Sequence, residues 1–187
     1  MSLYDEAILI QKPSGYKAEK LYNVKPSPQV SEQSSLEFDG VDDYLNAGDI
    51  LNYTTDFTIS CWIKASTGTD AYNGLITKYS TYGWDLILNN GKIRMGLRGS
   101  SQIDTGGVGN DLRDNKWHYI VAVNTNTSIK IYIDGVLKGT STGTWTPTTT
   151  TQVLKIGHRD GINYFNGSIS DVAIFSRALN QSDVKEI

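Results

Sequence analysis

Hydrophobic and polar residues alternate along most of the chain after position 55. A period of two places the apolar side chains on one face of a β-strand. The alternation is clearest in DFTISCWIKA (56–65), GKIRMGLR (91–98) and SIKIYIDG (128–135). Similar patterns predict further strands at GLITKYS (74–80), GWDLIL (83–88), WHYIVAV (117–123), VLKIG (153–157) and SISDVAIF (168–175). Trp84 continues the alternation of Leu86 and Leu88, which favours a place in the core.

Turn clusters such as NNG, NTNTS and GHRDG separate these segments, and no helical period interrupts them. Only ALNQSDVKEI (178–187) has helical features, with Asn180 as a candidate N-cap and Asp183 in the position of a capping box. About ten short alternating strands without interleaved helices are typical of sandwiches and jelly rolls. We therefore predict an all-β fold, an antiparallel β-sandwich with a short C-terminal helix.

The segment VKPSPQVSEQS (24–34) contains two prolines among mostly polar residues. Proline fixes φ and removes a backbone donor, so this segment is predicted to be an extended linker. It would separate an N-terminal anchoring arm (1–23) from a main domain (35–187). A chain of 187 residues suits one domain of ordinary size with such an appendage.

Composition narrows the classes of function. The net charge of −3 and pI near 5.3 argue against binding to nucleic acid, which needs clustered Lys and Arg. No apolar run is long enough for a membrane helix, so we expect no membrane insertion. The first residues lack the features of a signal peptide, and the single Cys61 excludes a disulfide framework. We expect a protein that is made and assembled in a cytoplasm.

With the strands in this order, the main domain resembles a laminin-G-like, concanavalin A-like jelly roll of the pentraxin type. The resemblance is carried by LEFDGVDDYLNAG (36–48), FTISCWIKA (57–65), GLITKY (74–79) with GWDLIL (83–88), DNKWHYIVAV (114–123), IKIYIDGVL (129–137) and YFNGSISDVAIFSRALNQSDVKEI (164–187). Separately, KPSGYKAEKLYNVKP (12–26) is similar to a leader that precedes such domains in bacteriophage tail and other structural proteins. This fold is shared by lectins, receptors and virion proteins, so the resemblance alone does not specify one function.

The resemblance also implies a structural calcium ion where the first strand of the domain meets the last. It places the ligands on Asp39 and Asp171, with backbone carbonyls completing the shell. Hard cations such as Ca²⁺ take carboxylate and carbonyl oxygens. The alternative is a plain hydrogen-bonded turn, in which Asp39-Gly40 forms the turn and Asp42 caps a neighbouring amide.

Catalysis is not expected. Glycosidases on this scaffold carry Glu-x-Asp-x-x-Glu on one strand, which sets two carboxylates across the scissile bond, and the sequence contains no such run. His118 and His158 are the only histidines, and neither accompanies a recognisable Ser or Cys nucleophile.

Binding of a glycan needs aromatic rings for the apolar faces of sugars and polar groups for their hydroxyls. The candidates are Tyr82, Arg94, Arg98, Trp145, Arg159, Asn163 and Tyr164. Trp145 lies among Thr and Gly residues, so it is either an exposed contact or a ring folded over a sheet edge. Arg94 and Arg98 share one strand face and could instead be a solvated charge pair.

These observations predict a non-catalytic virion protein of a phage tail or capsid, assembled in the host cytoplasm. Its jelly roll would bind host-surface glycans, and its N-terminal arm would hold other virion subunits. We expect a homo-oligomer or multicopy assembly, because many copies strengthen weak sites. Two alternatives remain open: a decoration protein that stabilises the particle without binding glycan, and a carbohydrate-binding accessory module of a cellular enzyme.

Overall fold

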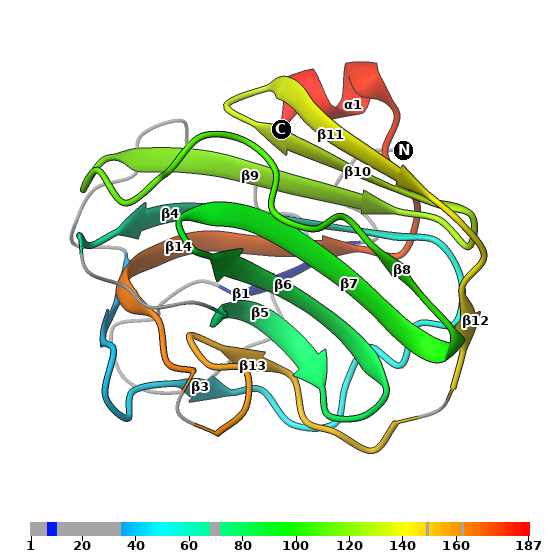
Figure 1. The fold of residues 1–187 in the computed structure, drawn as a ribbon, viewed down its shortest axis with the longest axis horizontal. Helices are drawn as coiled ribbons and strands as arrows, with labels where there is room; N and C mark the ends of the chain where they lie inside the picture. Colours follow the sequence, from blue (N-terminus) through cyan, green and yellow to red (C-terminus); the bar gives the residue numbers. More distant parts are fainter. Residues whose placement is uncertain (1–6, 11–34, 68–71, 149, 162) are drawn as a thin grey trace.

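The computed structural model describes residues 7–10, 35–67, 72–148, 150–161 and 163–187. In these residues, two antiparallel β-sheets pack face to face as a sandwich (Figure 1). The first sheet runs in the order β1 (Ala7–Ile10), β14 (Asn166–Phe175), β4 (Phe57–Ala65), β9 (Trp117–Asn124), β10 (Ser128–Ile133) and β11 (Val136–Thr142), with β2 (Leu36–Asp39) also on β14. The predicted antiparallel sandwich is confirmed.

The second sheet lies in front of the first in Figure 1. Its order is β12 (Thr146–Pro147), β7 (Lys92–Ser101), β6 (Gly83–Asn89), β5 (Asn73–Tyr79), β13 (Lys155–Ile156) and β3 (Leu45–Asn46), with β8 (Ile103–Asp104) paired to β7. One face of this sheet covers the core. The other faces outward and carries most of the candidate site.

The core lies between the sheets and is filled by the alternating apolar side chains. Phe57, Ile59, Cys61 and Ile63 of β4 belong to the same buried cluster as Ile93, Met95 and Leu97 of β7. Trp84 is also part of this cluster, as the alternation predicts. Burial of these faces excludes apolar surface from water, which is the main driving force for the sandwich.

A second, smaller apolar cluster covers the outer face of the first sheet. It joins β9, β10 and β14 to helix α1 (Gln181–Glu186), whose Val184 is buried. Asn180 and Asp183 form the predicted capping box. A helix of six residues is too short to be stable alone, so it depends on this docking. No helix within the described ranges is long and apolar enough to span a membrane.

The prediction that residues 1–23 form a separate arm is wrong for residues 7–10. Ala7 to Ile10 pair with Val172 to Phe175 of β14, so this segment is a strand of the first sheet rather than part of a separate arm. Strand β2 pairs with the other half of β14, so β1 and β2 follow one another along the same edge. The linker at 24–34 and the phage-like leader at 12–26 lie outside the described residues.

Candidate functional site

The outward face of the second sheet is charged rather than merely polar. Alternation along β6 and β7 directs Trp84, Met95 and Leu97 into the core, so Asp85, Arg94 and Arg98 lie on the opposite face. Gly96, on the same outward face, pairs with Asp85 in the register. A Cβ atom at Gly96 would lie 2.4 Å from Asp85 Oδ1, so only glycine leaves room for this carboxylate.

Two carboxylates hold three arginines in place on this face. Asp104 of β8 accepts from Arg94 Nε at 2.9 Å and from Arg98 Nη2 at 2.6 Å. Asp85 accepts from Arg159 Nε at 2.7 Å. The three arginine side chains retain only 13–15% of their exposure, so they lie flat on the sheet instead of extending into solvent.

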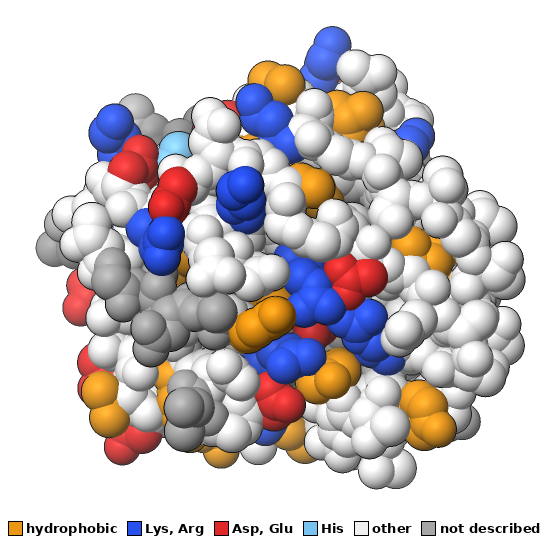
Figure 2. Space-filling model, viewed as in Figure 1, with side chains coloured by type: hydrophobic (Ala, Val, Ile, Leu, Met, Phe, Trp, Pro, Cys, Tyr) orange, Lys and Arg blue, Asp and Glu red, His pale blue; other side chains and the backbone are white. Residues whose placement is uncertain are grey.

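Two tyrosine rings complete the set. The Arg159 guanidinium lies 4.1 Å from the centre of the Tyr79 ring. The Tyr72 ring lies 5.6 Å from Arg94 and 5.9 Å from Arg159, and Tyr72 is 43% exposed. We name this set the arginine face; its members are Tyr72, Tyr79, Asp85, Arg94, Arg98, Asp104 and Arg159. Figure 2 shows Lys and Arg side chains gathered around acidic ones in the middle of this side of the molecule.

The two carboxylates differ in electrostatics. Burial disfavours ionisation of Asp104, but hydrogen bonds from Arg94, the Gly106 amide and Arg98 outweigh it and lower the pKa to about 2. Burial raises the pKa of Asp85 despite its bond to Arg159. Asp85 Oδ1 is buried and accepts no hydrogen bond from the described residues. Asp104 is therefore ionised at neutral pH, whereas burial makes the ionised form of Asp85 less favourable.

The loop before β14 brings Arg159 to this face. Asn163 Nδ2 donates to the Asp160 carbonyl at 2.8 Å, and Tyr164 stacks on His158 with ring centres 4.2 Å apart. The structure thus brings together Arg94, Arg98 and Arg159 from the predicted set. Asn163 and Tyr164 shape the loop beside them.

Tyr82 and Trp145 lie elsewhere. Tyr82 is 42% exposed at the turn between β5 and β6, next to Gly83. Trp145 is only 3% exposed and meets the edge of Phe57 with ring centres 6.3 Å apart. The prediction of Trp145 as an exposed glycan contact is therefore wrong, and the alternative of a ring folded over the sheet edge is confirmed. The neighbours of Trp145 in the sequence are polar, whereas its apolar partner, Phe57, comes from a distant strand. The local sequence therefore did not indicate that the ring is buried.

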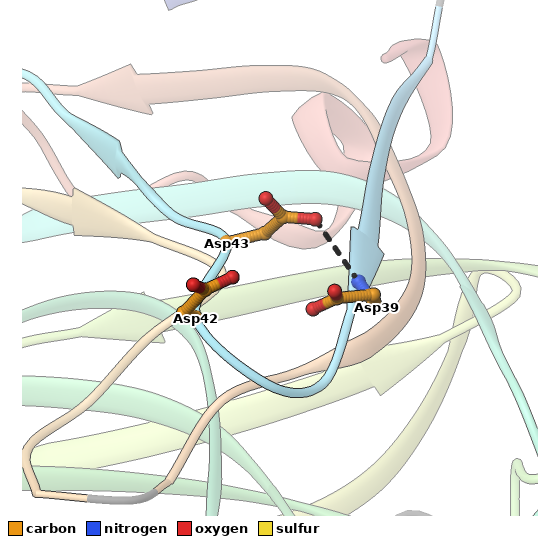
Figure 3. Close-up of side chains that lie close together, drawn as sticks. All are labelled: Asp39, Asp42 and Asp43. Atoms are coloured by element: carbon orange, nitrogen blue, oxygen red, sulfur yellow. Dashed lines mark hydrogen bonds between the residues drawn. The ribbon is translucent and has the colours of Figure 1, made fainter.

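The acid-rich turn after β2 gathers three carboxylates, Asp39, Asp42 and Asp43 (Figure 3). One ligand oxygen from each lies within 4.8 Å of the others. Asp39 Oδ1 accepts from the Val41 amide at 2.8 Å, and Asp43 Oδ2 accepts from the Asp39 amide at 3.3 Å. Backbone hydrogen bonds therefore shape the turn, and the donor set is one that suits a hard cation.

The predicted calcium ligands Asp39 and Asp171 do not come together. Asp39 pairs with Asn166 in the register of β2 and β14, and Asp171 lies five residues further along β14. At ~3.3 Å per residue this separates the two by on the order of 15 Å, too far for one ion. Any calcium site at this turn would use Asp39, Asp42 and Asp43 instead.

Calcium at the turn stays a prediction. We expect excess Ca²⁺ to raise the midpoint of thermal unfolding relative to protein in EDTA, because an ion that binds only the folded state stabilises it. Asp42→Asn should remove most of this shift while keeping the backbone hydrogen bonds of the turn, which use Asp39 and Asp43. Glu37→Gln, at an exposed acid on β2, is the control and should keep the shift. Equal midpoints with Ca²⁺ and EDTA would exclude the ion.

Four members of the arginine face were not predicted: Tyr72, Tyr79, Asp85 and Asp104. Asp85 could have been predicted from the sequence, since the alternation of β6 puts this acid on the outward face, beside Arg94 and Arg98 of β7. Asp104 comes from the two-residue strand β8 and Tyr72 from a connection, and both segments are too short for periodicity to indicate the direction of a side chain.

Comparison with known proteins agrees with this architecture. The profile of Laminin_G_3, described as the concanavalin A-like lectin/glucanases superfamily, matches residues 39–185. No curated protein matches the chain significantly in sequence. Among solved structures, the binding domain of Paraclostridial Mosquitocidal Protein 1 is similar over 98% of this chain and 52% of its own length, with TM-score 0.76 and 17% identity.

Two further structures are similar. The receptor-binding domain of the botulinum neurotoxin C/D mosaic serotype matches over 97% of this chain and 50% of its own, with TM-score 0.70 and 22% identity. Domain 4 of AbnA, an extracellular arabinanase from Geobacillus stearothermophilus, matches over 96% and 86%, with TM-score 0.67 and 15% identity. The chain thus spans about half of the two toxin domains. Identities this low show a shared fold alone.

Proposed function

We propose that the chain, which belongs to the Laminin_G_3 family of the concanavalin A-like superfamily, is a non-catalytic domain that binds glycan on its arginine face. Similar folds include toxin binding domains and an arabinanase domain in complex with arabinotriose. These neighbours support binding as the role of the scaffold. The residues of this chain must supply the specificity.

The observation that carries the proposal is the fixed array of arginines. A solvent-facing sheet gains little from burying three guanidinium groups, since ordinary surface ion pairs contribute little to stability. Here each group is held by a carboxylate and lies nearly flat. Nη1 of Arg94 and Nη2 of Arg159 donate to no other described residue. The array therefore offers preorganised donors at low cost in entropy.

Sugars match this surface in two ways. Their hydroxyl oxygens accept hydrogen bonds from the unused guanidinium N–H groups. Their apolar ring faces pack on aromatic rings, which Tyr72 and Tyr79 supply beside the arginines. Because Asp85 and Asp104 offset much of the positive charge, the surface favours polyhydroxyl ligands over strongly anionic ones.

The side chains outside the arginine face that could take part in catalysis, Cys61 and His118, are poorly suited to it, which favours a binding role. Burial raises the pKa of the Cys61 thiol to about 12, so it is not a nucleophile at neutral pH. Both ring nitrogens of His118 face carboxylates, at 2.9 Å to Asp134 and 3.2 Å to Asp114, which suits a structural role. On the arginine face, Asp104 is tied to two arginines and is poorly placed to act as a general acid.

The proposal is tested by binding to a glycan array, followed by titration calorimetry with the best ligand. We expect Arg94→Ala and Tyr72→Ala each to weaken binding about tenfold, the factor supplied by one good polar or aromatic contact. Arg113→Ala is the matched control, since Arg113 is also paired with an aspartate, Asp111, but is not a member of the arginine face. Equal affinity of the wild type and Arg94→Ala would contradict the proposal.

The biological setting of this binding is a further proposal. A virion protein displaying many copies would gain avidity from weak sites, in agreement with a shallow surface such as the arginine face. The leader that suggests a phage lies outside the described residues, so the virion role and its subunit partners stay predictions. A protein whose domain is silent on the array, but whose loss destabilises a particle, would instead be a decoration protein.

A further inference from the structure

The loop that carries Arg159 also carries an aromatic surface on its other side. Thr77 Oγ1 donates to the His158 carbonyl at 2.8 Å, and Asn73 Nδ2 donates to the Tyr164 carbonyl at 2.6 Å. Gly74 of β5 lets the loop approach, since a Cβ there would lie 2.2 Å from the His158 backbone. These contacts pin both ends of the loop to β5. A pinned loop presents its side chains in fixed directions.

His158 and Arg159 use this fixed backbone in different ways. Arg159 joins the arginine face through Asp85, whereas His158 stacks on Tyr164 at 4.2 Å and meets Tyr44 at 5.3 Å between ring centres. Tyr44 comes from the turn after β2 and is 46% exposed. Lys155 Nζ lies 5.7 Å from the centre of the Tyr44 ring. We name Tyr44, His158 and Tyr164 the aromatic platform.

The aromatic platform is not part of the hydrophobic core. None of its three residues belongs to either buried apolar cluster, and Tyr44 leaves nearly half of its surface to water. His158 is 6% exposed, yet its Nδ1 has no hydrogen-bond partner among the described residues. Burial lowers the pKa of His158, so the ring is neutral at pH 7 and stacks as an uncharged aromatic. The exposed ring of Tyr44, backed by the buried His158 ring, is therefore a candidate contact for the apolar face of a sugar.

We propose that the aromatic platform is a second sugar subsite, and that the ligand of this domain is an oligosaccharide reaching from the arginine face across the pinned loop. This inference rests on the proposed function and specifies its ligand class. One sugar unit lies on Arg94, Arg159 and Tyr72, and a later unit of the same chain packs its apolar face on Tyr44. Arg159 belongs to the first subsite and the adjacent His158 to the second, and the contacts of their loop with β5 set the spacing between the subsites, so that short sugars fill only the first.

The test uses ladders of arabinose, xylose, glucose and N-acetylglucosamine, each from the monosaccharide to the hexasaccharide, titrated into the full chain. For at least one ladder, affinity should rise with length and then level off. Tyr44→Ala should remove about tenfold of this gain and leave the affinity for the shortest bound sugar unchanged. Val136→Ala, an exposed apolar residue on the first sheet, is the control and should behave as the wild type.

The outcomes separate the two proposals. If a ladder binds but Tyr44→Ala keeps the full gain with length, the second subsite is wrong and the proposed function stands. Affinity that does not depend on length in any bound ladder overturns the second subsite as well. If no ladder binds, the second subsite fails, and the proposed function fails with it only when the glycan array is silent too. Tyr44 is exposed and outside the core, so its replacement should leave the thermal unfolding midpoint close to that of the wild type.

Discussion

Replacing Phe57 with alanine is expected to lower the free energy of unfolding by about 4 kcal/mol. Phe57 is fully buried at the start of β4. Its ring stacks on Tyr53 at 5.3 Å and contacts Trp84 at 5.4 Å and Trp145 at 6.3 Å between centres. These rings come from both sheets and two connections, so they cannot all move in to fill the space. The cost therefore includes both lost transfer free energy and a cavity.

Urea unfolding followed by circular dichroism measures this change, with an unchanged m-value indicating that the folded state is still compact. Val136→Ala removes an apolar side chain that is 53% exposed and should change stability by less than ~0.5 kcal/mol. A loss below ~1 kcal/mol for Phe57→Ala would mean that the aromatic contacts between the sheets are not formed in solution.

The fold followed from the sequence because its main signal is local. A strand repeats every two residues, so short windows such as 57–63 and 93–97 reveal which side chains face the core. The small cluster under α1 had no such signal. Val121 and Phe175 face outward on the first sheet, and they are buried only because a helix from the chain's end docks there. Burial of the second face depends on tertiary contacts that periodicity does not contain.

Pairing over long sequence distances explains the errors. The sequence placed Ala7 to Ile10 in an arm, because a segment of four residues does not specify that it pairs with Val172 to Phe175. The resemblance correctly brought the first and last strands of the domain together. The register of β2 and β14 then set Asp39 opposite Asn166 rather than near Asp171. Topology was predictable, whereas register depends on packing along the whole strand.

The candidate site shows the same division. Arg94 and Arg98 were placed on one face by spacing alone, and the structure agrees. Their shared acceptor, Asp104, arrives from a two-residue strand, and Arg159 arrives from a loop more than sixty positions away. Sequence reasoning therefore found the donors but not the carboxylates that fix them.

Replacing Asp104 with alanine is the change expected to affect both stability and binding. The folded-state pKa of about 2, against an ordinary 3.8, corresponds to about 2 kcal/mol of stabilisation above pH ~4. Because the folded pKa is depressed, this stabilisation is lost as pH falls from ~4 toward 2. Asp104→Ala should therefore unfold about 2 kcal/mol more easily at neutral pH, and the difference from the wild type should shrink over that acidic range. Urea titrations at several pH values measure it.

Asp111 provides the control, because its pKa is also lowered to about 2, by hydrogen bonds from the Arg113 side chain and amide. Its side chain is 52% exposed, so solvent and salt screen the pair, and Asp111→Ala should have a much smaller effect that vanishes at high salt. Asp104→Ala also frees Arg94 and Arg98 from their common acceptor. Glycan affinity should therefore fall with it, because the two guanidinium groups lose the carboxylate that fixes their geometry. An Asp104→Ala protein with wild-type affinity would show that the guanidinium groups need no fixed geometry to bind.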